Sequence, residues 1–592
     1  MHGLQQRLLQ KPSRLTILGR RDSPAELLML AFAQPPRPLP PLPPPEIRVL
    51  RREQGNIVRI DGQELKSPWA WTPRNNGQPP RLWLPMDLLE NRLGVRRDGD
   101  DLVWFGQKQR LSDLPRQSLG DEVALDAWPW LNQLGITPER SIQQLELVLP
   151  PPTLQSMRRG TGHRSDRLVL DLDGPLFVQR IGNDLSLNIR LERDQVRALQ
   201  RQKIGAIRRG QTLLLRGQAT RLRTVSLSNP WRLVLDGVRP ALRQGDRRTP
   251  QALPLTHPQI APLLRKGFVL ERLQIKVGVK PLEIWRAGGP LESLGLTLRP
   301  LTKGGSQQGL RFLPQLAPAN QVLTAVNGGF FNRITQLPLG ALRQNGTWLS
   351  GPILNRGAIG WKLGQSPLFG RLHLTQTLRG PNRQVLTLTH LNSGYIQKGF
   401  SRYTSAWGPR YRPLSGQEEA VLIQNGQVLR RIERNELRQG VLLTPTQDLI
   451  VARGGLSLPL QKDDRIRLTE RVNDPLGRLP NVLGGGPLLL LNHQVVLNGR
   501  AEGFSPDFLG VRAPRTIVGQ GTTGTWLIAL RGSTGSDPTL LETALAAQQL
   551  KLRHALNLDG GSSTTMVVAG RTVMNGRGSP PFIHNGIGLG ML

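Results

Sequence analysis

The sequence predicts a multidomain protein that is mostly β with some α/β: two small β-rich modules are followed by a C-terminal α+β domain. Three observations predict this class. A chain of 592 residues is too long for one core, since domains usually hold roughly 100–200 residues. Its 65 glycines and 49 prolines suit short strands joined by turns. Few segments have the length and spacing of amphipathic helices, which disfavours a helical bundle.

The charge of the chain is strongly positive, with a formal net charge of +36. Nucleic-acid binding is one interpretation, because Lys and Arg neutralise phosphates. However, the arginines are spread along the whole chain and no nucleic-acid motif occurs. We therefore expect no nucleic-acid partner and favour general attraction to anionic glycans of a bacterial envelope.

Cysteine is absent from the chain, which excludes disulfides, thiolate metal ligands and a thiol nucleophile. The eight histidines are scattered without ligand spacing, so a zinc site is not expected. The sequence indicates no cofactor. A calcium or magnesium ion on an acidic side chain would leave no clear trace in the sequence, so this alternative stays open.

Residues 1–46 form a predicted leader and proline-rich linker. Basic residues precede the apolar run 27–33, which ends in a small-x-small sequence typical of a signal peptide. An unstructured leader is the alternative. The stretch 34–46 is a polyproline spacer. No apolar run reaches about 18 residues, so no transmembrane segment is predicted, and we expect a periplasmic, cell-envelope or secreted location.

Residues 47–145 predict a small α+β module. Alternating strands are expected at 47–50, 57–60 and 102–105, with hairpin turns at 61–62 and 98–99, and a helix over 84–94. This order resembles the N-terminal domain of copper amine oxidases. Six tryptophans gather here, and they could form core or stack on sugars; core is favoured. They are Trp69, Trp71, Trp83, Trp104, Trp128 and Trp130.

Residues 146–248 predict a β-sandwich. The blocks 166–175 and 229–236 both contain Arg-Leu-Val-Leu-Asp beside a turn or proline. They resemble the signature strands of AMIN domains, which implies an association with the cell envelope and with peptidoglycan as a partner. Residues 249–269 then form a proline-punctuated linker to the C-terminal domain, 270–592.

Two glycine motifs in the C-terminal domain suggest close contact with a ligand. The run 323–332 predicts an apolar strand ending at Asn327, after which Gly328 and Gly329 could adopt positive φ and let the backbone approach a ligand. A plain turn is the alternative. The run 483–491 places three glycines, Gly484 to Gly486, before an apolar strand, and their N–H groups could face an anion. It lacks the ending of a nucleotide-binding P-loop.

Two further motifs carry charged side chains at strand ends. Arg515 begins a predicted strand that pairs with 525–531, where a guanidinium could bind a phosphate. A helix over 539–550, apolar at Leu541, Ala544 and Leu545, precedes the strand 555–559. Strand alternation puts Asn557 and Asp559 on one face, and a carboxylate at that end could act as general acid or base.

Together these motifs resemble the phosphodiester glycosidase family, over residues 270–592. The family pattern has Asn-Gly-Gly-Phe-Phe, Gly-Gly-Gly-Pro, Ala-x-Arg-Thr and Leu-Asn-Leu-Asp-Gly-Gly, and it closes with an Asn after a proline turn, here Asn585. The middle segments 391–395 and 403–408 also resemble it. The sequence departs from the pattern at Ser562, at Pro580-Pro581 and at 530–532, which puts the substrate and the activity in question.

The resemblance implies hydrolysis of the bond between a sugar's anomeric carbon and a phosphate. The implied substrate is a sugar phosphodiester or another anionic glycan of the envelope or exopolysaccharide, whereas a glycan- or peptidoglycan-binding protein without turnover is the alternative. The candidate catalytic residues are Asp559, Asn327 and Arg515. The candidate substrate-binding residues are Gly328, Gly329, Asn557, Gly485, Gly486, Gly560, Gly561, Ser563, Thr564 and Asn585.

Overall fold

The computed structural model describes residues 53–592, apart from 75–76, 121, 161–165, 203, 239–253 and 534–535. The predicted leader, the polyproline spacer, the strand at 47–50 and part of the predicted linker lie outside these residues. Strands dominate and form several separate sheets, and the prediction of a mostly β protein is confirmed. In the described part of the chain, no helix is long and apolar enough to cross a membrane.

The first module is a seven-stranded sheet in the order β7-β8-β3-β2-β1-β10-β9, with a second sheet of three strands, β4-β5-β6. Asp61 and Gly62 form the β1–β2 turn with positive φ, as predicted. The helix predicted at 84–94 is present as α1 (Met86–Leu88) and η1 (Leu89–Leu93), and it ends at the left-handed Gly94. The strands are β1 (Glu53–Ile60), β2 (Gln63–Thr72), β3 (Arg81–Pro85), β4 (Arg96–Asp98), β5 (Asp101–Trp104), β6 (Gln107–Arg110), β7 (Arg116–Leu119), β8 (Glu122–Asp126), β9 (Glu139–Arg140) and β10 (Gln144–Leu147).

The tryptophans of this module form its core. Five of the six are buried, and Trp128 is partly buried against Trp71, with ring centroids 5.1 Å apart. The buried indoles cannot present a face to a sugar. The interpretation of these residues as core is confirmed.

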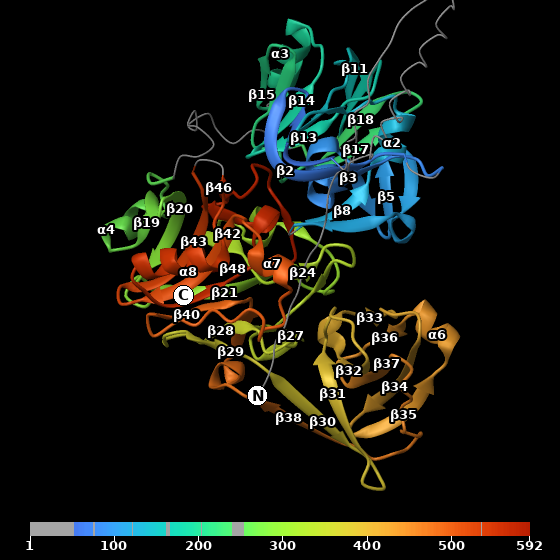
Figure 1. Cartoon of the computed structure of the whole chain (residues 1–592), viewed down its shortest axis with the longest axis vertical. Helices are drawn as coiled ribbons and strands as arrows, with labels where there is room; N and C mark the ends of the chain where they lie inside the picture. The colour runs from blue at the N-terminus through green and yellow to red at the C-terminus, as the bar shows by residue number, and fades with distance from the viewer. Residues whose placement is uncertain are drawn as a thin grey trace, which may run out of the picture. The chain divides into compact units, whose positions relative to one another are not determined.

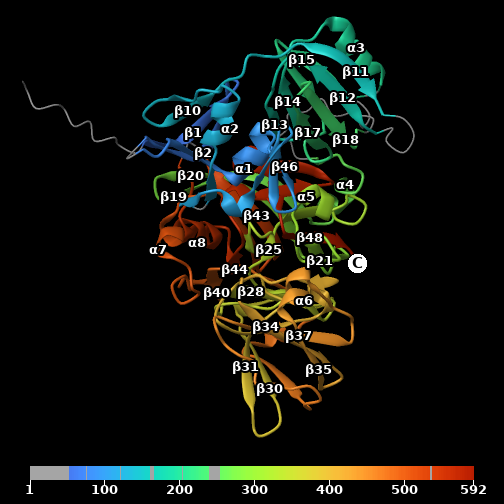
Figure 2. The same cartoon turned by 90° about the vertical axis from the view of Figure 1, so that its right-hand side faces the viewer.

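The second module consists of two four-stranded sheets that share one core (Figure 2). The two similar blocks form β12 and β18, which pair antiparallel. Because they run in opposite directions, the Arg of each block meets the Asp of the other: Arg167 binds Asp236, and Arg232 binds Asp171 at 3.2 Å. The sheets comprise β11 (Leu154–Arg159), β12 (Leu168–Leu172), β18 (Arg232–Asp236) and β17 (Arg223–Leu227), and β13 (Val178–Ile181), β14 (Asp184–Asn188), β16 (Thr212–Leu215) and β15 (Ala206–Arg209), with helix α3 (Arg193–Arg201).

Three sheets of the C-terminal domain meet in one hydrophobic core, to which Val518, Ile587 and Leu483 each contribute from a different sheet. The first sheet contains β19 (Val269–Val277), β20 (Lys280–Gly289), β43 (Gly524–Gly532), β42 (Arg515–Gly521), β44 (Leu552–Asn557), β40 (Leu488–Leu491) and β41 (Gln494–Val495). The second contains β21 (Leu296–Thr302), β48 (Asn585–Met591), β23 (Thr324–Asn327), β45 (Thr565–Val568) and β46 (Arg571–Asn575). The third contains β27 (Thr347–Ser350), β26 (Leu342–Gln344), β39 (Asn481–Gly484), β28 (Gly357–Trp361) and β29 (Leu368–Arg371).

Helix α8 (Leu540–Gln549) packs against β40, β44 and β19 of the first sheet (Figure 1). Thr539 caps it, because its side chain accepts from the N–H of Glu542, whose own side chain returns to the Thr539 N–H. The helix was predicted at this place, and its apolar residues are only partly buried. Leu541 and Leu545 are exposed, whereas Ala544 and Ala547 pack on the sheet, since the small side chains permit a close approach.

The segment that follows β29 and precedes β39 in the sequence forms a further seven-stranded sheet, which has a hydrophobic core on each face. Alternation along one strand supplies both: Leu449 and Val451 belong to one core, and Ile450 and Ala452 to the other. The strands in spatial order are β35 (Gln427–Ile432), β34 (Glu418–Gln424), β37 (Gln447–Arg453), β32 (Gly399–Tyr403), β31 (Val385–Leu391), β30 (Leu374–Arg379) and β38 (Arg467–Val472). We call this part, residues 374–472, the insert.

A buried ion pair joins two strands of the insert. The Arg453 guanidinium is 1% exposed and donates to Glu418 Oε1 at 2.8 Å. It also donates to the hydroxyls of Tyr403 at 2.8 Å and Tyr411 at 2.7 Å. The aromatic residues of the 403–408 motif therefore have a structural role here.

We expect Arg453→Met to lower the free energy of unfolding of the insert by about 3–5 kcal/mol, because it leaves the Glu418 carboxylate buried without its cation. Chemical denaturation measures the loss. Arg430→Met removes the exposed pair with Glu436 and should cost no more than about 1 kcal/mol. Equal losses in the two variants would contradict the account.

Candidate functional site

Asp559 lies two residues beyond the end of β44, between the first and second sheets of the C-terminal domain. Its N–H donates to Gly328 O at 3.0 Å, and its carboxylate accepts from Gly560 N at 3.1 Å. Burial raises the pKa of Asp559 to about 7, although its hydrogen bond to Ser563 and the charge of Arg333 oppose the shift. A carboxyl group with this pKa can exchange a proton near neutral pH.

Asn327 holds the backbone of this site rather than facing a ligand. Its Nδ2 donates to Asp559 O at 2.7 Å, and its Oδ1 accepts from Thr516 Oγ1 at 2.7 Å and from Thr565 N at 3.1 Å. The side chain is buried and its amide groups are committed to the protein. In this structure Asn327 is therefore a positioning residue for Asp559, and a catalytic role for it stays a prediction.

The first glycine pair packs two strands together in this structure, and its contact with a ligand stays a prediction. Gly328 and Gly329 do not have positive φ, and both their N–H groups are used by Asn585, through its backbone O at 2.9 Å and its Oδ1 at 2.8 Å. A Cβ on Gly328 would lie 2.0 Å from Asn585 Oδ1. These glycines are required for close packing of β23 against β48, and Asn585 serves the same packing.

The second glycine run behaves in the same way. The N–H groups of Gly484, Gly485 and Gly486 donate to the carbonyls of Ala341, Gly357 and Asn557 at 2.7, 2.9 and 2.7 Å. None of them is available to cradle an anion. Gly486 has φ +122, and a Cβ there would collide with Glu502 and Phe504.

Asn557 and Arg515 lie near Asp559, and their side chains have different hydrogen-bond partners. Asn557 is buried and donates to Gly486 O at 2.7 Å, while its Oδ1 has no partner among the described residues. Arg515 is 2% exposed, donates to Val511 O and packs near Gly560. Both side chains are buried, so a ligand reaches them only if neighbouring groups move.

Arg333 is the group that sequence reasoning missed. It donates to Ser562 Oγ at 3.2 Å and Ser563 Oγ at 3.3 Å, beside Asp559. It also faces Asp87 of the first module, at 3.6 Å. Burial opposes its charge, but Asp87, Glu122 and further carboxylates raise its pKa. Its place directly after the 323–332 motif was the available signal.

The first module contributes carboxylates to this cluster. Glu122 Oε1 accepts from Ser562 N at 3.2 Å and lies 3.5 Å from Arg577 Nε. Burial raises the pKa of Asp87 to about 6 and that of Glu90 to about 7. Ser562, at which the sequence departs from the family pattern, thus contacts the first module through its N–H group. Its side chain accepts a hydrogen bond from Arg333 of the C-terminal domain.

The other predicted binding residues are mostly buried. Thr564 and Ser563 belong to the short segment after Asp559, and Gly561 has φ +60 with its N–H on Pro514 O at 2.8 Å. Among the described residues, no group of three or more His, Asp or Glu side chains could hold a metal ion.

An aromatic cluster borders the site on its other side. Phe330 follows the glycine pair and lies 5.5 Å from Phe504 and 5.7 Å from Phe508, measured between ring centroids. The Arg356 guanidinium lies 4.0 Å from the Phe504 ring centroid. Phe330 and Phe508 are only partly buried, so part of each side chain is exposed to solvent.

The raised pKa of Asp559 has a consequence for stability. Because the folded-state pKa exceeds the ordinary value of 3.8, folding becomes less favourable as pH rises through the window from about 4 to 7. Asp559→Asn removes this cost. The free energy of unfolding of Asp559→Asn, relative to that of the natural chain, should therefore rise by roughly 2–3 kcal/mol between pH 5 and pH 8.

Denaturation at the two pH values measures this difference, and the exposed Asp507→Asn gives the baseline. If the free energy of unfolding of Asp559→Asn differed from that of the natural chain by the same amount at pH 5 and at pH 8, a raised pKa of Asp559 would be contradicted.

Comparison with known proteins identifies part of this domain. Residues 408–589 match the phosphodiester glycosidase family. The matched range contains Arg515, Asp559 and Asn585, whereas β23 with Asn327 precedes it and is brought between β45 and β48 by the fold. The match does not include the two N-terminal modules, and the comparisons do not support the AMIN-like resemblance of the second.

Two solved structures are similar to this chain. A hypothetical protein from Synechocystis is 28% identical with a TM-score of 0.54, over 91% of this chain and 99% of its own. The catalytic domain of zebrafish N-acetylglucosamine-1-phosphodiester alpha-N-acetylglucosaminidase, auto-inhibited by its pro-peptide, is 16% identical with a TM-score of 0.30, over 55% and 82%. No curated protein matches the chain.

The likeness to the Synechocystis protein covers 91% of this chain, so it includes residues of both N-terminal modules. The shared architecture therefore extends beyond the C-terminal domain. The family match and the order of the motifs agree on the C-terminal part. Residues 408–589 of this chain are therefore similar to a phosphodiester glycosidase domain.

Proposed function

We propose that the C-terminal domain hydrolyses the bond between the anomeric carbon of a sugar and a phosphodiester, in an anionic glycan of the cell envelope or exopolysaccharide. The observation that carries this proposal is Asp559, a carboxyl group with a pKa of about 7 beside Arg333 in a phosphodiester glycosidase domain. It supplies proton-transfer chemistry at the place where the family motifs converge.

Asp559 acts as the general base in this proposal. Water attacks the anomeric carbon and gives its proton to the carboxylate, while the bond from that carbon to the phosphate oxygen breaks and its electron pair leaves with the phosphate. A phosphate monoester leaves as an anion near neutral pH, so it needs no proton from the protein. The negative carboxylate also stabilises the positive charge that develops on the sugar.

Arg333 and Arg515 are the cations for the phosphate. Both guanidiniums lie against the segment that follows Asp559, Arg333 through Ser562 and Ser563, and Arg515 beside Gly560. A planar guanidinium can bind two phosphate oxygens at once. Because both side chains are buried, substrate binding requires the contacts that cover them to open.

The partly buried faces of Phe330 and Phe508 provide the surface for the sugar ring. Aromatic faces pack well against the apolar side of a ring while its hydroxyls remain available for hydrogen bonds. The unpaired Oδ1 of Asn557 is an acceptor for such a hydroxyl or for a water molecule. The two N-terminal modules would hold the chain near envelope glycan or peptidoglycan.

A glycan-binding protein without turnover is the second candidate. One observation favours it: Glu122 of the first module contacts Ser562, so the segment beside Asp559 is covered. The N–H groups of both glycine runs are also committed within the protein. A domain that binds glycan but never opens at Asp559 would have these features.

Release of free sugar from a panel of sugar 1-phosphate methyl diesters, in both anomeric forms, separates the two candidates. We expect turnover by the full chain and a loss of at least about 100-fold in Asp559→Asn, because the base is removed. The exposed Asp507→Asn should retain full activity. Binding of glycan without sugar release from any diester would support the second candidate.

The pH dependence of that activity reports the protonation of Asp559. As a base it must be charged, so kcat/KM should fall as pH drops through about 7. Glu122 raises the pKa of Asp559 by its negative charge. Glu122→Gln should therefore move the fall in activity to lower pH. A fall that stays in place, or moves to higher pH, would contradict this role of Glu122.

A further inference from the structure

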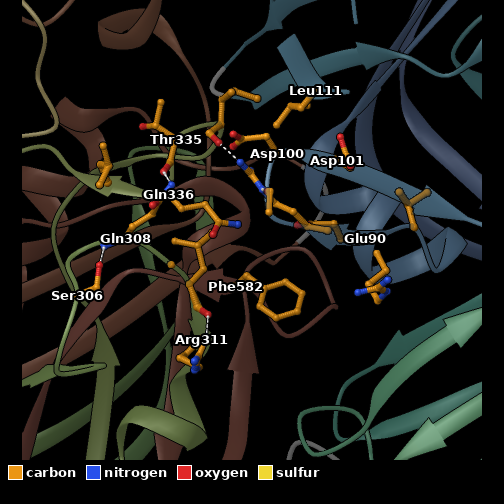
Figure 3. Close-up of a pocket in the computed structure, with 18 of the residues that line it drawn as sticks. Glu90, Asp100, Asp101, Leu111, Ser306, Gln308, Arg311, Thr335, Gln336 and Phe582 are labelled. Carbon is orange, nitrogen blue, oxygen red and sulfur yellow. Dashed lines mark hydrogen bonds between the residues drawn. The ribbon is translucent and has the colours of Figure 1, made fainter. Parts of the chain in front are cut away.

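A large cavity of about 1460 Å³ lies between several parts of the chain (Figure 3). In Figure 3, Asp100 and Leu111 of the first module lie across the cavity from Gln308, Arg311 and Gln336 of the C-terminal domain. The second module and the insert also contribute to its lining. Its volume exceeds the roughly 300–1,000 Å³ of a site for a single small ligand.

The lining is strongly basic. Ten arginines face three carboxylates, an excess of seven positive charges. A cleft lined by one sign of charge concentrates ions of the opposite sign, because its low-dielectric walls focus the field. The exposed arginines come from four parts of the chain: Arg110 and Arg116, Arg221 and Arg223, Arg311, and Arg410 and Arg412.

Several of these cations are not used by the protein itself. The guanidiniums of Arg110, Arg223 and Arg412 make no hydrogen bond or ion pair with any described residue. By contrast, Arg180 is buried and donates to Leu222 O at 3.1 Å, and Arg97 donates to Arg333 O at 3.1 Å. Arg180 and Arg97 therefore build the wall, whereas Arg110, Arg223 and Arg412 remain for a ligand.

We infer that this cavity binds an oligosaccharide that carries several negative charges along its length. Phosphates and uronate carboxylates share the chemistry that guanidinium groups recognise. Between the arginines, Gln308, Gln336 and Ser306 offer amide and hydroxyl groups for sugar hydroxyls. Such binding is independent of the proposed hydrolysis and would stand without it.

Single-stranded nucleic acid fits this lining less well. Its tight binding needs aromatic faces on which bases stack. Here Phe312 and Phe582 stack on each other, with ring centroids 4.0 Å apart, and Trp407 is buried. The cavity therefore has cations and hydrogen-bonding groups but no open aromatic platform among its lining residues.

Binding of the full chain to fluorescent probes tests the inference. The probes are a hexamer of galacturonate, inorganic polyphosphate, neutral maltohexaose and single-stranded DNA of matched charge. We expect either or both of the first two to bind at least about tenfold tighter than maltohexaose and DNA. That affinity should fall at least about fivefold between about 0.05 and 0.3 M salt, since exposed charges are screened.

The variant that combines Arg110→Glu, Arg223→Glu and Arg412→Glu removes one cation from each of three parts of the chain. It should weaken binding of the anionic probes at least about tenfold, and the milder triple change to Gln should give an intermediate loss. The matched control, Arg209→Glu, Arg438→Glu and Arg467→Glu, changes the same charge at exposed positions outside the cavity.

Equal losses in the two triple Glu variants would overturn the inference, because binding would then depend only on net charge. Equal or tighter binding of DNA, equal binding of maltohexaose, or no binding of either anionic probe would also overturn it. Stronger binding of galacturonate or of polyphosphate shows whether the ligand bears carboxylates or phosphates. Sugar release from diesters is a separate readout, so failure of the proposed hydrolysis is distinguishable from failure of this binding.

Discussion

The position of Arg333 determines how the candidate site is built. This guanidinium is buried beside Asp559 and faces Asp87 and Glu122 of the first module. A buried cation is stable only when carboxylates compensate for its lost hydration, and removing one partner leaves an uncompensated charge. The first module and the C-terminal domain are therefore coupled through one electrostatic cluster. Burial is the main cause of the raised pKa of Asp559, and the charges of Arg333 and Glu122 modify it in opposite directions.

The sheets of the C-terminal domain give this cluster a rigid support. Asp559 and Asn327 follow or end strands of two different sheets, and the hydrogen bond from Asn327 Nδ2 to Asp559 O joins them. The glycine motifs serve the same purpose, because they let β23 and the 484–486 run pack closely against their neighbours. Motifs that suggest ligand contact are here mainly the means of holding one carboxyl group in place.

The local elements were predictable because they follow from local patterns. The Asp61-Gly62 turn, the Gly94 helix end, the Thr539 cap and the strand pair at 515–532 each depend on a few neighbouring residues. The family motifs also pointed to Asp559. What could not be predicted depends on distant contacts. Glu122 and Arg333 are far apart in the sequence, and only the fold brings them to one cluster.

The glycine N–H groups show the same limit. A glycine run is compatible with an anion cradle and with close packing, and only the partners of its N–H groups decide between the two. In this chain those partners are the carbonyls of Ala341, Gly357 and Asn557. The exposure of Leu541 on α8 also depends on packing within the fold, because Ala544 and Ala547 make the contact with the sheet instead.

The coupling through Arg333 is tested most directly by amide hydrogen exchange in Arg333→Met. The account predicts that protection falls together in the first-module helix at 86–93 and in the segment 559–563, while the Arg453 strand of the insert keeps its protection. Unchanged protection at 86–93, with or without a loss at 559–563, would contradict the claim that this guanidinium joins the first module to the site.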